Sequence, residues 1–428
     1  MTSRRTRKVL VSFGTAGDVY PFIAIGSALR ARGHDVVLVT HPRFHQRAAD
    51  RGLRTSGVGC DRVYRRALHN PELWSRRRGL RTVMSDLLPD PLETYEVLSQ
   101  LADEVPSLLV SHPFAFAARL LEEKRGVPCI TVVLSACLFR SNSSVPVMVG
   151  AQDPSKMPRP LKWLMWWLAD RLYIDPAVTP ILNGARRKLG LPDVRRPFGA
   201  WIHAPELTIG LFPEWFAPPQ PDWPRQTRLT GFARLRPRQP TSPEVIEFLD
   251  HRDPPIVFTC GSARPSMDRF VGPALEACRR IDRRALFLSP QPLPITIADP
   301  TRIHRARFAP LDEVLPSCAA IVHHGGIGTT AAALANATPQ IVSPIAHDHF
   351  DHAARVHRLG VGRRLLAPHF DAGNLADAIE YILQSHSIAA QCRRRARMLR
   401  DDDALARTCE LIEDMAHRTH PGRPGIAP

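Results

Sequence analysis

Short, continuous runs of apolar residues recur along the chain, and segments with helical spacing separate them. The run Lys8–Phe13 precedes a helix predicted over Pro21–Arg32, and a second run follows at Asp35–Thr40. Strands that are apolar on both faces and joined through helices are typical of a parallel sheet covered on both sides. The same pattern predicts further strands at Ser107–Val110, Pro128–Leu134 and Glu206–Phe212.

This pattern restarts after a proline-dense stretch between residues 213 and 243. Proline favours extended, irregular backbone, so the stretch predicts a join between two α/β halves. The strands predicted beyond it are Ile256–Thr259, Ala285–Leu288, Arg302–Phe308, Ala319–Val322 and Gln340–Ser343. The helices predicted there are Asp268–Ile281, Thr329–Asn336 and His349–Leu359.

Composition narrows the class of protein. The 428 residues are 44% hydrophobic and 23% charged, which permits a packed core and excludes wholesale disorder. No apolar run reaches the roughly 18 residues that span a bilayer, and Val9–Phe13 is too short for a signal sequence. We therefore expect a cytoplasmic protein. The eight scattered cysteines form no CxxC pair, which predicts reduced thiols and no structural zinc.

The formal net charge of +16 permits nucleic acid, anionic lipid or phosphate-bearing small molecules as partners. The basic run at residues 393–397 has no interleaved aromatic residues, so it predicts a solvated helix face rather than a nucleic-acid site. No lysine follows Lys188, which excludes a Schiff-base or Walker lysine from the second half.

The glycine-rich turn Gly325–Gly328 is the most informative segment. It follows a predicted strand that ends in His323-His324, and it precedes a helix predicted to begin at Thr329. Glycines let a ligand approach the backbone, and a helix N-terminus presents unpaired N–H groups, so the segment suits a phosphate or diphosphate. The alternative is an ordinary turn between a strand and a helix.

Around this turn the sequence resembles the inverting, metal-independent glycosyltransferases of family 1, which have the GT-B fold. The resemblance rests on Phe308-Ala309-Pro310, His323–Thr329, Asp348-His349 and the opening Gly14–Pro21, and it extends over nearly the whole chain. Segments such as 215–220 look particularly like the rhamnosyltransferases of bacterial rhamnolipid synthesis. Antibiotic and sterol glycosyltransferases are also similar.

The resemblance implies an architecture of two Rossmann-like, doubly wound α/β domains that face each other across a cleft. Residues 1–220 would form the acceptor-binding domain and residues 221–243 a proline-rich linker. Residues 244–386 would bind the nucleotide sugar. Residues 387–418 would form helices that cross back to the first domain.

The same resemblance implies a donor that is a dTDP- or UDP-linked sugar, with no metal and no other cofactor. Phe308 and Ala309 would contact the base, the turn with His323 and Thr329 would hold the diphosphate, and Asp348 would bind sugar hydroxyls. The usual Gln after that acid is His349 here. The full donor set is Gly14, Thr15, Gly17, Gly261, Ser262, Phe308, Ala309, His323, Gly325, Gly326, Gly328, Thr329, Asp348 and His349.

Asp18 is the predicted catalytic base. It lies in the loop after the first strand, where open α/β sheets place their ligands. Its carboxylate would take the proton of the acceptor hydroxyl as the oxygen attacks the anomeric carbon, and one displacement would invert that centre. A pKa raised by partial burial would improve the base. The alternative is a helix-capping acid.

The weaker acceptor-site candidates are His112 and the three tryptophans of one helical face, Trp163, Trp166 and Trp167. They predict either an apolar acceptor site and contact with an anionic membrane, or a structural histidine and a core helix. We first expect rhamnosyl-type transfer to a hydroxylated lipid, with no nucleic acid as partner. The alternatives are a UDP-glucosyl-type transferase of polyketides or sterols, a nucleotide-sugar 2-epimerase and a nucleic-acid-binding protein.

Overall fold

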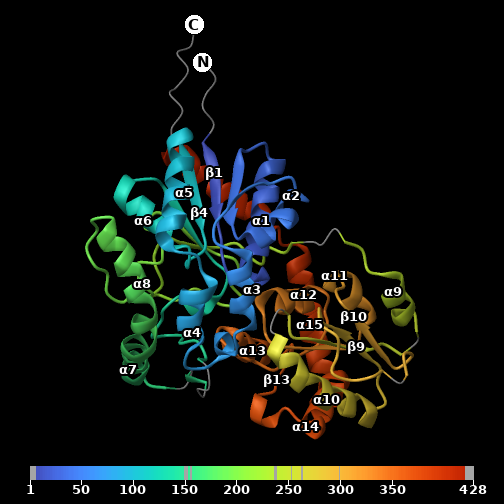
Figure 1. Ribbon diagram of the computed structural model, residues 1–428. Coiled ribbons are helices and arrows are strands. Elements are labelled where there is room, and N and C mark those ends of the chain that lie inside the picture. Colours follow the sequence, from blue (N-terminus) through green and yellow to red (C-terminus); the bar gives the residue numbers. More distant parts are fainter. Residues whose placement is uncertain are drawn as a thin grey trace.

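The structure, a computed structural model, describes residues 6–148, 153–154, 157–235, 239–251, 253–261, 264–297 and 299–419. Two parallel sheets with flanking helices lie side by side, the first in the blue-to-green half of the chain and the second in the yellow-to-orange half (Figure 1). The predicted α/β class with two Rossmann-like halves is confirmed.

The first sheet has seven strands in the order β3-β2-β1-β4-β5-β6-β7, and all of its strand pairs are parallel. Its central strands are fully buried, because apolar side chains alternate toward helices on both faces. The strands are β1 Arg7–Val11, β2 Val36–Thr40, β3 Arg54–Gly57, β4 Ser107–Ser111, β5 Cys129–Val133, β6 Thr208–Gly210 and β7 Thr227–Leu229.

The second sheet has six strands in the order β10-β9-β8-β11-β12-β13, again all parallel. In both sheets the strand order reverses beside a central strand, and α/β proteins bind ligands at such points. The strands are β8 Ile256–Thr259, β9 Ala285–Leu288, β10 Ile303–Ala306, β11 Ala320–His323, β12 Gln340–Val342 and β13 Gly362–Arg364.

The α-helices connect and flank these strands (Figure 1). Those of the first half are α1 Ala16–Ala31, α2 His45–Ala49, α3 Asp61–His69, α4 Gly79–Thr82, α5 Pro91–Glu104, α6 Phe116–Arg125, α7 Arg159–Ala169 and α8 Asp175–Lys188. Those that follow are α9 Pro243–Leu249, α10 Arg264–Arg280, α11 Leu311–Val314, α12 Ile327–Ala335, α13 His349–Arg358, α14 Ala372–Gln384, α15 His386–Arg400 and α16 Ala404–Thr419.

Among the predicted boundaries that differ from the structure, two concern the first half of the chain and the linker. Helix α1 begins at Ala16 rather than Pro21, because Thr15 and Asp18 form a reciprocal capping box that starts the helix earlier. Strand β7 lies within the predicted linker 221–243 and pairs with β6, so part of that segment belongs to the first sheet. Residues 236–238 of this segment lie outside the described residues.

The last two helices, α15 and α16, pack against different halves of the chain. Helix α15 contacts α12 and contributes Ile388 and Cys392 to the core of the second half. Helix α16 instead packs against α1, and its Ile412 is buried in the core of the first half. Glu413 fixes this position by accepting from Arg32 Nη2 at 2.8 Å. Of these two helices, only α16 crosses back.

Helix α13 joins the two halves. The ring of His352 donates from Nδ1 to the carbonyl of Gly325 (2.8 Å), so its Nε2 accepts from the hydroxyl of Ser135 in the first half (2.9 Å). Arg355 donates to the carbonyl of Phe216 at 3.0 Å and pairs with Asp351. These contacts hold the carboxyl end of β5 next to the glycine-rich turn.

The packing of α16 against the first half predicts that truncating one of its buried aliphatic side chains lowers the stability of the protein. Ile412→Ala should lower the free energy of unfolding by about 2–5 kcal/mol, because it leaves a cavity in the first half's core. Urea unfolding measures this loss. Glu410→Ala, at an exposed position of the same helix, is the control and should change stability by less than about 0.5 kcal/mol. Equal behaviour of the two variants would contradict the packing of α16.

Candidate active site

Asp18 lies at the start of α1, directly above the carboxyl end of β1. Its Oδ2 accepts from the backbone N–H of Thr15 (2.7 Å) and from the Thr15 hydroxyl (3.0 Å). Gly14 has φ +120°, and a Cβ there would lie 2.4 Å from Asp18 Oδ2, so only glycine fits. The predicted donor residues Gly14 and Thr15 therefore position the carboxylate. Gly17 is exposed beside it.

The second oxygen of Asp18 faces His112, which follows β4. Nε2 of His112 lies 3.8 Å from Asp18 Oδ1. The backbone N–H of Phe114 donates to Nδ1 (3.2 Å), so the proton of the neutral ring is on Nε2, toward Asp18. The ring is only 3% exposed. The structure thus brings Asp18 and His112 together, with His112 buried beneath the carboxylate.

Burial sets the charges of this pair. It raises the pKa of Asp18 to about 6, against the lowering effect of the Thr15 hydrogen bonds, and the negative charge of Asp348 raises it further. Burial lowers the pKa of His112 to about 3. At neutral pH Asp18 is therefore an ionised base with unusually high proton affinity, next to a neutral imidazole.

The glycine-rich turn connects β11 to α12, and the helix begins at Ile327, two residues earlier than predicted. Gly326 is its N-cap, and no side chain caps the first turn. Gly325 has φ +101°, where a Cβ would meet the side chain of Val342 at 2.9 Å. Gly328 and Thr329 lie in the first turn, exposed and half-buried. Free N–H groups at a helix N-terminus suit an anionic ligand.

His323 does not face this turn. Strand β11 extends through His323, so the fully buried ring bonds to Gln340 Oε1 (3.0 Å) and accepts from the backbone N–H of Gly325 (3.1 Å). With both ring nitrogens occupied, His323 holds the turn in shape from beneath. The diphosphate contact that the resemblance implies for His323 stays a prediction, and this geometry leaves no free ring nitrogen for it.

The next residue, His324, occupies the place that was predicted for His323. Its ring lies between two glycines: a Cβ on Gly261 or on Gly326 would come within 2.7 Å of it. Its Nδ1 is buried and has no hydrogen-bond partner among the described residues. Burial lowers the pKa of His324 to about 4. The ring is thus a polar group held close to the uncapped N-terminus of α12.

Asp348 enters the site from the N-terminus of α13. Its side chain is 30% exposed, and its Oδ2 lies 3.7 Å from His352 Nε2. The preceding residue, His347, has φ +51° and donates to the carbonyl of Leu73 in the first half (2.9 Å). His349 is buried, and its ring stacks against Trp74 of the first half at 6.5 Å. The two halves therefore meet around Asp348.

The remaining predicted donor residues lie on loops of the second half. Phe308 is 41% exposed after β10, which leaves its ring available for stacking, and Ala309 is buried. Gly261 follows β8 and has φ +58°. Ser262 lies outside the described residues.

The three tryptophans lie apart from Asp18 and His112. Trp163 is 56% exposed and Trp166 is 8% exposed, so α7 is neither a core helix nor a uniformly exposed one. All three rings line a different pocket of the first half, whose lining includes neither Asp18 nor His112. The predicted acceptor set is therefore split between two places.

Two side chains of the site were not predicted. His324 was overlooked because a strand boundary shifted by one residue, and the sequence offers no signal for that shift. Trp74 follows a short polar segment far from every motif, and only the fold brings it to His349.

Within the described residues, no three His, Cys, Asp or Glu side chains converge as metal ligands, and no helix is long and apolar enough to cross a membrane.

Each half of the sequence matches a domain of a known protein family. The Glycosyltransferase family 28 N-terminal domain matches residues 9–100, and the C-terminal domain of Erythromycin biosynthesis protein CIII-like proteins matches residues 275–416. The O-mycaminosyltylonolide 6-deoxyallosyltransferase of Streptomyces fradiae is 31% identical, over 98% of this chain and all of that protein. The sterol 3-beta-glucosyltransferase UGT80B1 of Arabidopsis thaliana is 24% identical over 94% of this chain and 67% of its own length.

Solved structures share the fold. The glycotransferase of kitacinnamycin superimposes with a TM-score of 0.75, at 19% identity, over 96% of this chain and 100% of its own. The glycosyltransferase VinC, solved in complex with dTDP, gives a TM-score of 0.65 at 18% identity over the same shares.

Proposed function

Because the chain belongs to the GT-B glycosyltransferases, which transfer a sugar from a nucleotide sugar, we propose that it moves a sugar from a dTDP-linked donor to a hydroxyl of an apolar natural product, with inversion. One observation carries this proposal: the ring of His352, 3.7 Å from Asp348 Oδ2, joins Ser135 of the first half to the glycine-rich turn of the second half. The relative named for its action on O-mycaminosyltylonolide and the dTDP complex of VinC support the acceptor and donor classes.

Asp18 supplies the base in this mechanism. Thr15 fixes Oδ2, so Oδ1 remains to accept the proton of the acceptor hydroxyl. With a pKa of about 6, Asp18 accepts this proton more favourably than an aspartate of ordinary pKa does, and it is still ionised at neutral pH. The Nε2–H of His112, 3.8 Å from Oδ1, keeps a positive hydrogen close to the carboxylate.

The glycine-rich turn supplies the second half of the mechanism. As the bond to the sugar breaks, negative charge grows on the departing nucleoside diphosphate. The uncapped N–H groups of α12 and the ring of His324 would stabilise that charge. Phe308 offers an exposed ring for the base of the nucleotide. No metal takes part in this proposal.

The role proposed for His324 predicts that its substitution weakens the binding of the nucleotide. His324→Ala should weaken the binding of dTDP about 10- to 100-fold, the effect of one lost hydrogen bond to a charged group. Thermal stabilisation by dTDP and by UDP measures this, because a bound ligand raises the melting temperature by mass action. The exposed His357, on α13, provides the control His357→Ala, which should bind dTDP normally. Binding that is unchanged in His324→Ala would remove this ring from the donor site.

The role proposed for Asp18 predicts how its substitution changes the rate of transfer and how that rate depends on pH. Asp18→Asn should lower kcat at least about 100-fold, with donor affinity nearly intact. In the native enzyme kcat/KM should fall about tenfold per pH unit below pH 6, because Asp18 must be ionised to act. A chelator should leave the rate unchanged. Full activity of Asp18→Asn, or a profile that is flat from pH 7 down to pH 5, would show that another group is the base.

A second candidate, rhamnosyl transfer to a hydroxylated lipid at an anionic membrane, is favoured by the surface of α7. Among the described residues, six of the twelve exposed large apolar side chains lie between Met157 and Leu172. Arg159 and Arg171 are exposed beside them. A helix with an apolar face and basic flanks suits the interface of an anionic bilayer.

Vesicle binding tests this second candidate. The protein should sediment with phosphatidylglycerol vesicles and much less with phosphatidylcholine vesicles, because the attraction is partly electrostatic. The double variant Leu164→Glu/Leu168→Glu should abolish the binding, whereas Ile246→Glu, at an exposed position on α9, should not. If the native protein stays in the supernatant with both kinds of vesicle, the membrane proposal fails and the natural-product acceptor remains.

A further inference from the structure

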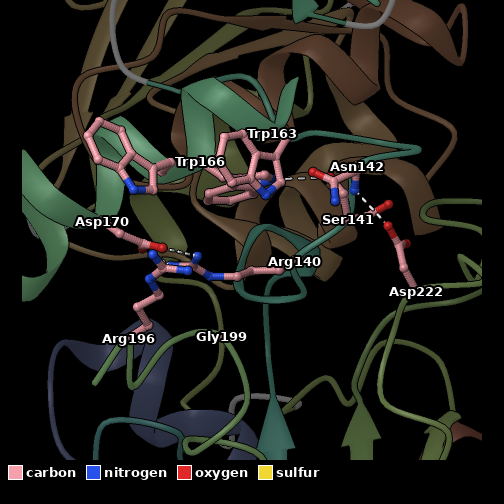
Figure 2. Close-up of a pocket in the computed structure, with 10 residues that line it drawn as sticks. Arg140, Ser141, Asn142, Trp163, Trp166, Asp170, Arg196, Gly199 and Asp222 are labelled. Carbon is pink, nitrogen blue, oxygen red and sulfur yellow. Dashed lines mark hydrogen bonds and ion pairs between the residues drawn. The ribbon is translucent and has the colours of Figure 1, made fainter. Parts of the chain in front are cut away.

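A separate pocket of about 270 Å³ opens in the first half, between α7 and the chain that follows β5 (Figure 2). The indole rings of Trp163, Trp166 and Trp167 line it, together with polar side chains from residues 140–142, 196 and 222. None of the catalytic or donor residues belongs to its lining. It is therefore a second site, which the transferase mechanism leaves without a role.

The charged groups of this pocket balance one another. Arg140 forms a two-pronged ion pair with Asp170, and its guanidinium lies 4.8 Å from the centre of the Trp166 ring. Figure 2 shows this pair in the wall of the pocket. The other two charged side chains of the lining are Arg196 and Asp222, again one of each sign. Since the formal charges cancel, the lining favours a neutral ligand over an anion or a cation.

Two buried polar atoms of the lining lack partners. Arg140 Nε is a donor and Asn142 Oδ1 an acceptor, and neither has a hydrogen-bond partner among the described residues. The backbone N–H of Asn142 donates to Asp222 Oδ2 at 2.7 Å, which fixes this loop in the wall of the pocket. A hydroxyl group can accept from the first atom and donate to the second, whereas a purely apolar ligand satisfies neither.

The aromatic rings define the other side of the ligand. Trp166 is anchored because its Nε1 donates to the carbonyl of Ser141 (3.1 Å), while Trp163 keeps an exposed face. Flat, rigid indole faces next to hydroxyl-binding groups suit a ring that is apolar on its faces and polar at its edge. The volume lies just below the usual range of about 300–1,000 Å³ for drug-sized ligands, so one small ring fits better than a polycyclic acceptor.

We propose that this pocket binds one neutral sugar ring. If the proposed function is correct, this ring belongs to an acceptor that already carries a sugar; the same chemistry also fits a free saccharide. Trp163 would stack on the ring, and the Arg140–Asn142 segment would bind its hydroxyls. The pocket would then select partly glycosylated acceptors, so that this enzyme would act after another glycosyl transfer.

Methyl β-D-glucopyranoside and methyl α-L-rhamnopyranoside test the proposal without any turnover. Both should quench or shift tryptophan fluorescence saturably, and saturation-transfer NMR should report contact with the ring protons. Trp163→Ala and Asn142→Leu should each weaken binding about tenfold or more, as expected for a lost stacking partner or hydrogen bond. The control is Leu172→Ala, which is exposed close by in sequence but absent from the lining, and it should bind normally. No saturable response to either glycoside in the native protein would overturn the proposal.

Charged and amphiphilic glycosides test whether the pocket prefers a neutral ring and whether that ring is attached to an apolar group. Methyl glucuronide and methyl glucosaminide should bind more weakly than the neutral glycosides, and stronger binding of either would overturn the argument from balanced charges. Octyl glucoside should bind more tightly than methyl glucoside if the sugar is carried by an apolar acceptor, and equally if it is free. Binding of octyl glucoside alone, insensitive to Asn142→Leu, would show only apolar contact and would also overturn the proposal. Because no arm requires catalysis, a failure here is distinct from a failure of the transferase mechanism.

Discussion

The contacts of α13 with the first half are the constraint on which the candidate active site depends. Asp18 follows a strand of the first sheet and Asp348 a strand of the second, so their relative position depends on how the two halves are held together. His352 does this directly by linking Ser135 to the carbonyl of Gly325. His347 adds a bond to Leu73 on the other side of Asp348. These bonds hold Asp348 and the glycine-rich turn against the first half of the chain.

Burial then gives similar polar groups different roles. It raises the pKa of Asp18, which becomes a better base, and it lowers the pKa values of His112, His323 and His324, which remain neutral rings at neutral pH. Neutral rings can hold the turn and orient a carboxylate without adding fixed charge. In the proposed mechanism the positive potential for a diphosphate comes from the uncapped start of α12, which needs no ionisable side chain.

Sequence reasoning succeeded where one physical signal dominates. Strands such as β2 and β8 are continuous apolar runs that only a covered parallel sheet accommodates, and both were predicted almost to the residue. The edge strands β3, β7 and β13 have the sequences RTSG, TRL and GRR, whose polar residues carry no strand signal, and they were missed. Their pairing comes from the neighbouring strand rather than from their own composition.

The candidate site shows the same division. Asp18 was predicted from its place after the first strand and the base chemistry of a carboxylate, and the glycine-rich turn from backbone chemistry. Which of His323 and His324 faces that turn depended on one residue of strand length. The tryptophans of α7 were recognised as unusual, but their separation from Asp18 follows from how the chain after β5 folds, and local spacing contains no information on that.

Hydrogen–deuterium exchange with and without dTDP tests the central claim most directly, because it reports on backbone N–H groups themselves. We expect dTDP to slow exchange most strongly in peptides that cover Gly325–Thr330, the turn and first helical residues of α12. Weaker protection should appear around Phe308. Stabilisation of the protein by dTDP with unchanged exchange at Gly325–Thr330 would contradict the claim that this helix start holds the diphosphate.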